Sequence, residues 1–319
     1  MRKINYNRFK YFTNKENYAE YIKSLDNNFD FNVVDKYKET ILTAAIHNKN
    51  LEFVKWLLLK KNVDINGDRK AKYYPLEIAC LISDLNIVEL LCKSPLINLN
   101  RDDDHSMIFA STSGDVNIIE ILIKKGWNLN KVINGRTVLH WAIQAQHIEV
   151  VKLLINTGAC VNFDKYGYDD DEVENSPLRT ALSEYSLALD NGEKCIAVAI
   201  SILDILLGYG ANINAFEEDG STILIDAICM KCDKKLIEFL LRKGAYINAT
   251  DREGRTALFY AKLRKQNDVA KMLIDNKADL TVVDTMGISL AILDDEEKRK
   301  KIFIEWYYPE EDTEYDVFF

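Results

Sequence analysis

Two cysteines separated by two residues, Cys229 and Cys232, form the pair best suited to redox or metal chemistry. Such a pair is half of a zinc site, or a redox-active dithiol within a βαβ unit. The sequence offers neither a second ligand pair nor a βαβ pattern around these residues. The other four cysteines are Cys80, Cys92, Cys160 and Cys195. Most of the six lie inside apolar helical patterns, as small buried residues do. We therefore expect reduced structural thiols, no metal site and no cofactor.

Acid–base or nucleophilic chemistry would need one of four histidines beside a serine, cysteine or acid: His47, His105, His140 and His147. No such set can be assembled from their positions. His105 follows the acids of residues 102–104, which leaves a weak metal site as an alternative, although the spacing is not distinctive of one. The glycines occur singly, so they do not form a phosphate-binding loop. We expect no catalytic residues and a protein that is not an enzyme.

The most acidic run, residues 169–174, lacks the glycine and the spaced ligands of an EF-hand calcium loop. A solvated surface loop is the preferred interpretation. The alternatives are an acidic loop that contacts a partner and a metal site.

The elements that must position these residues repeat along the chain. A hydrophobic residue followed by asparagine recurs after each apolar helical segment, at Asn32, Asn66, Asn100, Asn130, Asn162, Asn214 and Asn248, with a degenerate copy ending at Thr281. Successive copies are 34, 34, 30, 32, 52, 34 and 33 residues apart. A recurring period near 33 residues indicates a solenoid.

Each period has the same internal order. Residues 135–142 read Gly-Arg-Thr-Val-Leu-His-Trp-Ala, and residues 254–261 read Gly-Arg-Thr-Ala-Leu-Phe-Tyr-Ala. The threonines, Thr137 and Thr256, can cap a short first helix through their hydroxyl groups. A second helix follows, and its apolar face is predicted at Val150, Leu153 and Leu154. Glycines at the expected ends of second helices predict left-handed caps: Gly126, Gly158, Gly210 and Gly244.

This pattern resembles the ankyrin repeat, whose Thr-Pro-Leu-His-x-Ala signature and 33-residue length it shares over about residues 30–290. The resemblance implies an all-α fold, an ankyrin-repeat α-solenoid with short β-hairpin fingers and about seven repeats between terminal half-repeat caps. His140 stands at the signature histidine position, which the family uses for hydrogen bonds between repeats.

The repeats divide the chain into four parts. Residues 1–32 are expected to form an N-terminal capping helix or half-repeat, residues 33–283 repeats one to seven, residues 284–306 a C-terminal capping half-repeat, and residues 307–319 an acidic, aromatic tail. Repeat three is short, which predicts a truncated finger. Repeat five carries an insertion at about residues 167–200, which enters in the finger (residues 168–175) and between the paired helices (residues 189–194). Such insertions are expected in exposed loops.

The resemblance also implies a concave recognition surface made of finger tips and first helices. The residues at its variable positions are the candidate partner-binding residues: Lys36, Tyr37, Lys70, Tyr73, Asn134, Arg136, Trp141, Gln144, Glu218, Asp219, Arg252, Glu253, Arg255, Tyr260 and Arg264. Trp141 and Tyr260 have an alternative role in packing between neighbouring helices.

The formal net charge of −9 argues against a nucleic-acid partner. The chain has no apolar run of signal-peptide or membrane-spanning length, so we expect a cytoplasmic protein without a membrane association, and a monomer. Abundant Asn, Lys, Ile and Tyr indicate an AT-rich genome, such as that of a large DNA virus, a protist or an intracellular bacterium, in which case the host-cell cytoplasm is the expected location.

The leading hypothesis is a non-catalytic scaffold that binds a protein partner. The first alternative is an adaptor whose repeats hold a target while the tail recruits effector machinery, for example a ubiquitin ligase. A remote alternative is an enzyme with its site in the insertion of repeat five.

Overall fold

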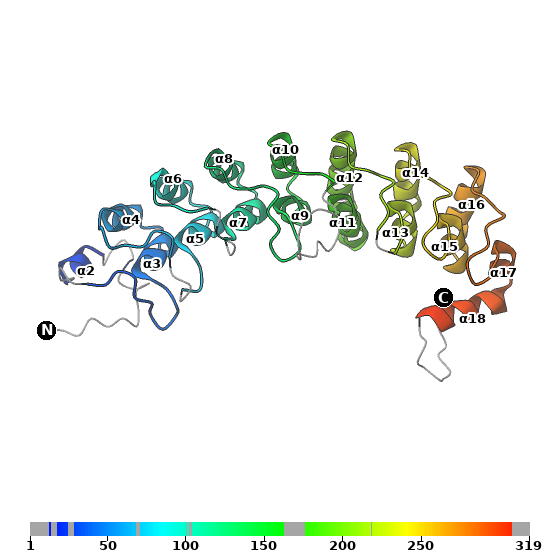
Figure 1. Ribbon diagram of the computed structural model, residues 1–319, viewed down its shortest axis with the longest axis horizontal. Helices are drawn as coiled ribbons and strands as arrows, with labels where there is room; N and C mark the ends of the chain where they lie inside the picture. Colours follow the sequence, from blue (N-terminus) through cyan, green and yellow to red (C-terminus); the bar gives the residue numbers. More distant parts are fainter. Residues whose placement is uncertain are drawn as a thin grey trace. The chain divides into compact units, whose positions relative to one another are not determined.

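The computed structural model describes residues 13, 18–24, 29–67, 71–99, 101, 104–162, 176–217 and 219–307 of the 319-residue chain. The chain divides into two units, Met1–Pro177 and Leu178–Phe319. Each unit is a stack of helix pairs (Figure 1). We call the first helix of each pair the inner helix, the second the outer helix, and the loop before each inner helix a finger. Within the described residues, no helix is long and apolar enough to cross a membrane.

In unit 1 the inner helices lie in one row and the outer helices in a second row (Figure 1). The inner helices are α3 (Ile41–His47), α5 (Pro75–Leu81), α7 (Ser106–Ser113) and α9 (Val138–Gln144). The outer helices are α4 (Leu51–Leu58), α6 (Leu85–Lys93), α8 (Val116–Lys124) and α10 (Ile148–Asn156). A short helix, α2 (Tyr18–Ser24), precedes them, and its Tyr18 ring lies 5.5 Å from the ring of Phe53 on α4.

Unit 2 repeats the same two rows, with one exception at its end (Figure 1). Its inner helices are α11 (Pro177–Asn191), α13 (Ile223–Cys229), α15 (Ala257–Leu263) and α17 (Leu290–Asp294). Its outer helices are α12 (Glu193–Gly208), α14 (Lys234–Arg242) and α16 (Asn267–Asp275). The last helix, α18 (Glu296–Tyr307), lies on the side of the inner helices instead of completing the outer row.

The helix boundaries follow the capping residues that the sequence predicts. Thr256 precedes α15, and its hydroxyl oxygen accepts a hydrogen bond from the backbone N–H of Phe259 at 3.3 Å. Thr137 occupies the same position before α9. All four predicted cap glycines have positive φ: Gly126 (88°), Gly158 (110°), Gly210 (88°) and Gly244 (95°). A left-handed residue ends a helix at low cost only where no Cβ is present, so these glycines fix the ends of the outer helices.

The core lies between the two rows, and each outer helix buries residues at positions i, i+1 and i+4. Val150, Val151 and Leu154 of α10 are all buried. The predicted face was therefore partly wrong, because Leu153 is only half-buried while Val151 is fully enclosed. An outer helix inside a stack packs against its own inner helix and against its outer neighbours, so its buried face is wider than a single stripe.

At four places in the described residues, the recurring asparagine joins one repeat to the next. The Asn66 side chain donates a hydrogen bond from Nδ2 to the carbonyl oxygen of Leu96 (2.8 Å) and accepts one at Oδ1 from the N–H of Asn98 (2.8 Å). Three further asparagines make the same pair of bonds to residues 28 to 32 positions later: Asn32, Asn130 and Asn214. The spacing seen in the sequence thus comes from a hydrogen-bonded ladder along each unit.

The additional residues of repeat five lengthen its helices. α11 has 15 residues and α12 has 16, whereas α13 has 7 and α14 has 9. Gly192, at φ 97°, connects the two long helices. Residues 190–194 are exposed, as expected, but they do not form a loop: this part of the insertion extends both helices by about two turns each. Residues 168–175 lie outside the described residues.

Repeat three has a short finger, as predicted. Twelve residues separate Lys93 of α6 from Ser106 of α7, against fourteen between Gly208 of α12 and Ile223 of α13. Asp104 is buried in this short connection and accepts a hydrogen bond from the N–H of Ser106 at 2.8 Å. The carboxylate therefore satisfies the backbone N–H group of the first residue of the inner helix, which has no partner within the helix.

Replacing Asn66 with alanine removes both ladder bonds between its repeat and the next. We expect the free energy of unfolding to fall by roughly 1–3 kcal/mol, since each hydrogen bond contributes about 0.5–1.5 kcal/mol. Urea denaturation followed by circular dichroism measures this loss. The control is Asn86→Ala on the exposed face of α6, which should change stability by less than about 0.5 kcal/mol. Equal effects of the two substitutions would show that the ladder does not stabilise the stack.

Candidate functional site

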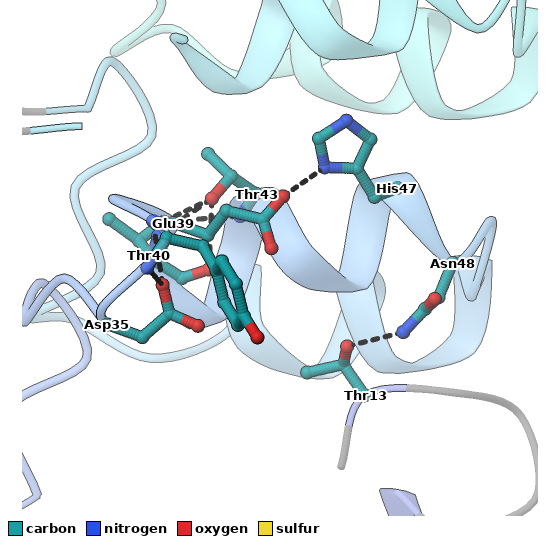
Figure 2. Close-up of polar contacts among 8 residues, drawn as sticks. Thr13, Asp35, Glu39, Thr40, Thr43, His47 and Asn48 are labelled. Carbon is teal, nitrogen blue, oxygen red and sulfur yellow. Dashed lines mark hydrogen bonds and ion pairs between the residues drawn. The ribbon is translucent and has the colours of Figure 1, made fainter. Parts of the chain in front are cut away.

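An aspartate closes the turn of three fingers. In the first finger, Asp35 Oδ1 accepts hydrogen bonds from the backbone N–H groups of Tyr37 (2.8 Å) and Glu39 (3.1 Å). Figure 2 shows Asp35 against the backbone of this turn, next to Thr40. Asp251 and Asp284 accept from the residues two and four positions later in the same way, at 2.8 to 3.0 Å. The tips of these fingers are thus held by hydrogen bonds that leave the tip side chains outside the turn.

Neighbouring fingers are also joined by backbone hydrogen bonds. The N–H of Lys72 donates to the carbonyl oxygen of Lys38 at 2.9 Å in unit 1. In unit 2, Arg252 donates to Asp219 at 3.1 Å and Thr285 donates to Glu253 at 2.9 Å. Side chains on successive tips are therefore presented from a connected backbone.

The structure exposes several of the predicted partner-binding residues at these tips. In unit 1, Lys36, Tyr37 and Asn134 are exposed, with 56% of Tyr37 accessible. In unit 2, the exposed members are Asp219, Arg252 and Glu253. Tyr73 is half-buried. Lys70 and Glu218 lie outside the described residues.

Three predicted residues of repeat four meet on one surface. Arg136 donates a hydrogen bond from Nη1 to Gln144 Oε1 at 3.2 Å. Its guanidinium carbon lies 5.3 Å from the centre of the Trp141 ring, within cation–π range. Trp141 and Arg136 are half-buried and Gln144 is exposed. The finger and the inner helix α9 thus contribute to one polar and aromatic cluster.

Arg255 and Tyr260, by contrast, have partners within the chain. Arg255 Nε donates to Asp284 Oδ2 at 3.1 Å, and its guanidinium carbon lies 3.7 Å from the centre of the Trp306 ring. The Tyr260 hydroxyl donates to Asp251 Oδ2 at 2.6 Å. Arg264, also half-buried, makes a side-chain hydrogen bond with Cys229. These three side chains stabilise repeats six to eight, so we leave them out of the surface proposed below.

Trp306 is a contact that the sequence analysis did not find. It extends from α18 over Arg255, and its ring is stacked with that of Phe259 at 6.2 Å and 12°. Because α18 lies on the inner-helix side, it covers part of the finger of repeat seven. The aromatic run that begins at Trp306 is visible in the sequence. The residues that Trp306 contacts could not be predicted from it, because they depend on the direction that the chain takes after α17.

All four histidines contact neighbouring groups of the chain. Figure 2 shows the Glu39 carboxylate pointing at His47, with 2.5 Å between Oε1 and Nδ1. His105 pairs with the buried Glu77 at 3.1 Å. Residues 102–103, which precede it in the sequence, lie outside the described residues. His140 Nδ1 accepts from the N–H of Thr137 at 3.1 Å within its own repeat. His147 Nε2 lies 3.0 Å from the carbonyl oxygen of Thr112, which stands 35 residues earlier in the preceding repeat.

Burial makes the CxxC pair unreactive. Desolvation raises the pKa of Cys229 to about 11 and that of Cys232 to about 12, so both remain thiols at neutral pH. A dithiol of this kind is a poor nucleophile and a poor metal ligand. In the described part of the chain, no group of three or more His, Cys, Asp or Glu side chains could hold a metal ion.

A half-buried ion network, which spacing alone did not indicate, links the finger of repeat six to repeat five. Arg179 of α11 lies 3.0 Å from Asp226 Oδ1 and 3.3 Å from Glu217 Oε2. Burial raises the pKa of Asp226 to about 6, although the Arg179 guanidinium opposes the shift. Asp226 stands one position after the signature histidine position, where Trp141 and Tyr260 stand in repeats four and seven.

Two further parts of the sequence analysis lie outside the described residues. They are the acidic run at residues 169–174 and the tail from residue 308 onward. The calcium, partner-contact and solvated-loop interpretations of that run remain predictions.

Comparisons with known proteins identify the repeat. The family model described as "Ankyrin repeats (3 copies)" matches residues 11–103, 97–165 and 194–284, which is more than half of the chain. A putative ankyrin repeat protein of Acanthamoeba polyphaga mimivirus is 30% identical over 138 residues, which cover 43% of this chain and 16% of that protein. The ankyrin repeat and KH domain-containing protein mask-1 of Caenorhabditis elegans is 30% identical over 129 residues, covering 39% of this chain and 5% of its own length. The chain thus matches only a small part of these relatives.

Among solved structures, the ankyrin repeat domain of Bcl-3 superposes with a TM-score of 0.59 at 19% identity. The match covers 72% of this chain and 98% of that domain, which is described as a unique member of the IkappaB protein family. The likeness concerns the fold. It confirms the predicted all-α solenoid of ankyrin repeats.

Alkylation should rank the cysteines by burial. We expect the exposed Cys160 to react with iodoacetamide at pH 8 at least about ten-fold faster than Cys229 and Cys232, because only the thiolate attacks. Peptide mass spectrometry after timed quenching measures each rate. Fast modification of the CxxC pair in the folded chain would contradict the burial argument.

The raised pKa of Asp226 predicts a pH dependence of stability. Between its ordinary value of 3.8 and about 6, the folded state holds the proton more tightly than the unfolded state. Protonation therefore stabilises the fold in this window, and that stabilisation is lost as pH rises through 6. In Asp226→Asn, unfolding free energy relative to wild type should increase from pH 4.5 to pH 7. Denaturation at several pH values tests the slope, and a flat difference would contradict it.

Proposed function

Because the chain belongs to the ankyrin-repeat family, we propose that it is a non-catalytic scaffold that binds a protein partner through its fingers and inner helices. Ankyrin repeats generally serve as protein–protein interaction modules. The residues that we propose for contact are the exposed or half-exposed members of the predicted set: Lys36, Tyr37, Tyr73, Asn134, Arg136, Trp141, Gln144, Asp219, Arg252 and Glu253.

The observation that carries this proposal is the separation of roles within each finger. The aspartate carboxylate and the backbone hydrogen bonds hold the turn, while exposed side chains such as Tyr37 and Arg252 take no part in holding it. A surface whose backbone is already ordered loses little conformational entropy on binding. Aromatic and arginine side chains on such a surface are the types that contribute most to interface affinity.

The state of the polar side chains supports a non-catalytic role. Each histidine contacts a carboxylate, threonine or carbonyl group of the chain, and the CxxC thiols are held protonated by burial. General acid–base or thiol chemistry would need such groups to face a substrate with a pKa near the working pH.

Substitution of three tip and inner-helix residues tests the proposed surface. We expect the combination Tyr37→Ala, Gln144→Ala and Arg252→Ala to reduce capture of a specific protein from a cell lysate by at least about ten-fold, since interface aromatics and arginines each contribute more than about 1 kcal/mol. Quantitative mass spectrometry of the captured proteins gives the ratio to wild type.

The matched control changes an aromatic, an amide and an arginine that are exposed elsewhere. Tyr246→Ala, Asn117→Ala and Arg242→Ala lie on or beside outer helices and should leave capture unchanged. Equal capture by both variants would overturn the assignment of the surface. Circular dichroism melting shows that both remain folded.

A further inference from the structure

In unit 1, the exposed charges on the fingers and inner helices are positive throughout the described residues. We call this surface the inner face of unit 1; it consists of α3, α5, α7 and α9 and of the described finger residues 33–40, 71–74, 101, 104–105 and 131–137. Within these residues, the exposed charged side chains are Lys36, Lys38 and Lys72. The whole chain has a net charge of −9, so this face differs in sign from the rest of the protein.

The acids of the inner face are buried or engaged with other groups. Its described residues contain four acids, and none of them is exposed. Asp35 accepts hydrogen bonds within the first finger turn, and Glu39 faces His47 at 2.5 Å. The other two, Glu77 and Asp104, are buried. A ligand on this face therefore meets the lysines without meeting an exposed carboxylate of these residues.

On the outer helices of the same unit, lysine is instead paired with an acid. In each of α4, α6, α8 and α10, a lysine ammonium group lies 2.9 to 3.6 Å from a glutamate carboxylate one turn away. The pairs are Lys55–Glu52, Lys93–Glu89, Lys124–Glu120 and Lys152–Glu149. The positive surface is thus a property of the inner face and not of unit 1 as a whole.

Aromatic rings lie beside the exposed lysines. Lys36 Nζ is 4.8 Å from the centre of the Tyr37 ring, and Lys72 Nζ is 5.1 Å from the centre of the Tyr73 ring. The Tyr73 ring packs edge-on against Phe109 of α7, with 6.0 Å between the ring centres. The face of an aromatic ring attracts an ammonium group, so each tyrosine restrains its lysine at the surface. The inner face therefore presents cations and aromatic surface together.

Two further contacts of this kind lie on the inner face of unit 1. The guanidinium carbon of Arg101 is 3.5 Å from the centre of the Tyr74 ring, and that of Arg136 is 5.3 Å from the centre of the Trp141 ring. Both arginines are half-buried. The combination of a cation and a ring thus continues from the first finger to repeat four.

The backbone holds the lysines of the first two fingers next to each other. The N–H of Lys72 donates to the carbonyl oxygen of Lys38 at 2.9 Å, which joins the two fingers. Packed helices lie about 8–10 Å apart, so successive fingers follow at about this distance. Three residues of an extended chain span about 10 Å. An extended ligand with a carboxylate at every third residue therefore matches the spacing of the fingers.

The fingers of unit 2 differ in charge. Their exposed charged residues include Asp219 and Glu253 beside Arg252. Arg255 is covered by Trp306 and paired with Asp284. An acidic ligand would meet mixed charge there.

We infer that the inner face of unit 1 binds an extended acidic segment of a partner protein, rich in aspartate or glutamate. The inference rests on the proposed scaffold function and gives the chemical class of its partner. Carboxylates of the segment pair with Lys36, Lys38 and Lys72, and its apolar side chains pack on the accessible parts of Tyr37 and Tyr73.

Titration of the full chain into a labelled acidic peptide tests this inference. The probe is a fluorescein-labelled peptide with glutamate at every third position and with tyrosine, serine and glycine between. A matched peptide has glutamine in place of each glutamate. We expect saturable binding of the acidic peptide by fluorescence anisotropy, weakening as salt is raised because the charges are exposed. The glutamine peptide should bind at least about ten-fold more weakly.

Removal of the three exposed cations should weaken binding of the acidic peptide by about ten-fold, since three exposed ion pairs are lost together. The variant is Lys36→Gln, Lys38→Gln and Lys72→Gln, in which glutamine keeps most of the length of each side chain. The control, Lys55→Gln, Lys93→Gln and Lys124→Gln, removes the same charge from exposed positions on the outer helices of the same unit and should leave the affinity unchanged.

Absence of saturable peptide binding, or an equal loss in both triple variants, would overturn the inference. Equally tight binding of an oligothymidylate of the same charge would also overturn it, because the face would then not select a protein segment.

The outcome is separable from that of the proposed function. Capture of a lysate protein that depends on Gln144 and Arg252 but not on the three lysines would leave the scaffold role standing, while the acidic partner is ruled out. Peptide binding that depends on the lysines, without any such capture, would support the site for an acidic segment and contradict the wider surface proposed for the scaffold.

Discussion

The side-chain amide of the recurring asparagine, seen at Asn32, Asn66, Asn130 and Asn214, is the contact on which the stack depends. Its oxygen and its nitrogen satisfy one N–H and one carbonyl group of the next repeat, just beyond the end of the outer helix. These backbone groups have no partner in their own helix, so leaving them unpaired would be costly. Only a side chain that both donates and accepts can serve both groups, and the asparagine amide does so with two different atoms, Nδ2 and Oδ1. Each repeat is thus stabilised by its neighbours, as in a one-dimensional lattice.

The same arrangement explains why the fingers can vary. Backbone groups near the tips are satisfied by Asp35, Asp251 or Asp284 and by the adjoining finger, so the tip side chains have no structural task there. Unit 1 places lysine and tyrosine at these positions, whereas unit 2 places acids beside arginine. The backbone of the fingers is therefore similar from repeat to repeat, whereas the exposed side chains at their tips differ. That combination suits recognition by several small contacts distributed over successive repeats.

The repeat length, the caps and the fold were predictable because they depend on interactions close in sequence or repeated at fixed intervals. Thr256, Gly126 and the asparagine period are of this kind. The exposure of candidates such as Tyr37 and Arg252 at finger tips could also be predicted, because each stands at a known position within its repeat. The contacts of Arg255 with Trp306 and of Arg179 with Asp226 could not, because they depend on where α18 turns and on how a lengthened α11 meets the next finger. Burial of Val151 in place of Leu153 similarly reflects neighbours on two sides of α10.

The long helices of repeat five show where a repeat of this fold can accept additional residues, namely at the connection between its two helices. The first turns of α11 and the last turns of α12 keep the ordinary packing role, while the additional turns meet at Gly192 beyond the length of α13 and α14. Growth at that end leaves in place the bonds of Asn214 to Gly244 and Tyr246 in the next repeat. A stacked protein can therefore acquire a projecting helical hairpin without altering the register between its repeats, and later sequence change at exposed positions such as Leu187 is free of the constraints that act on the rest of the repeat.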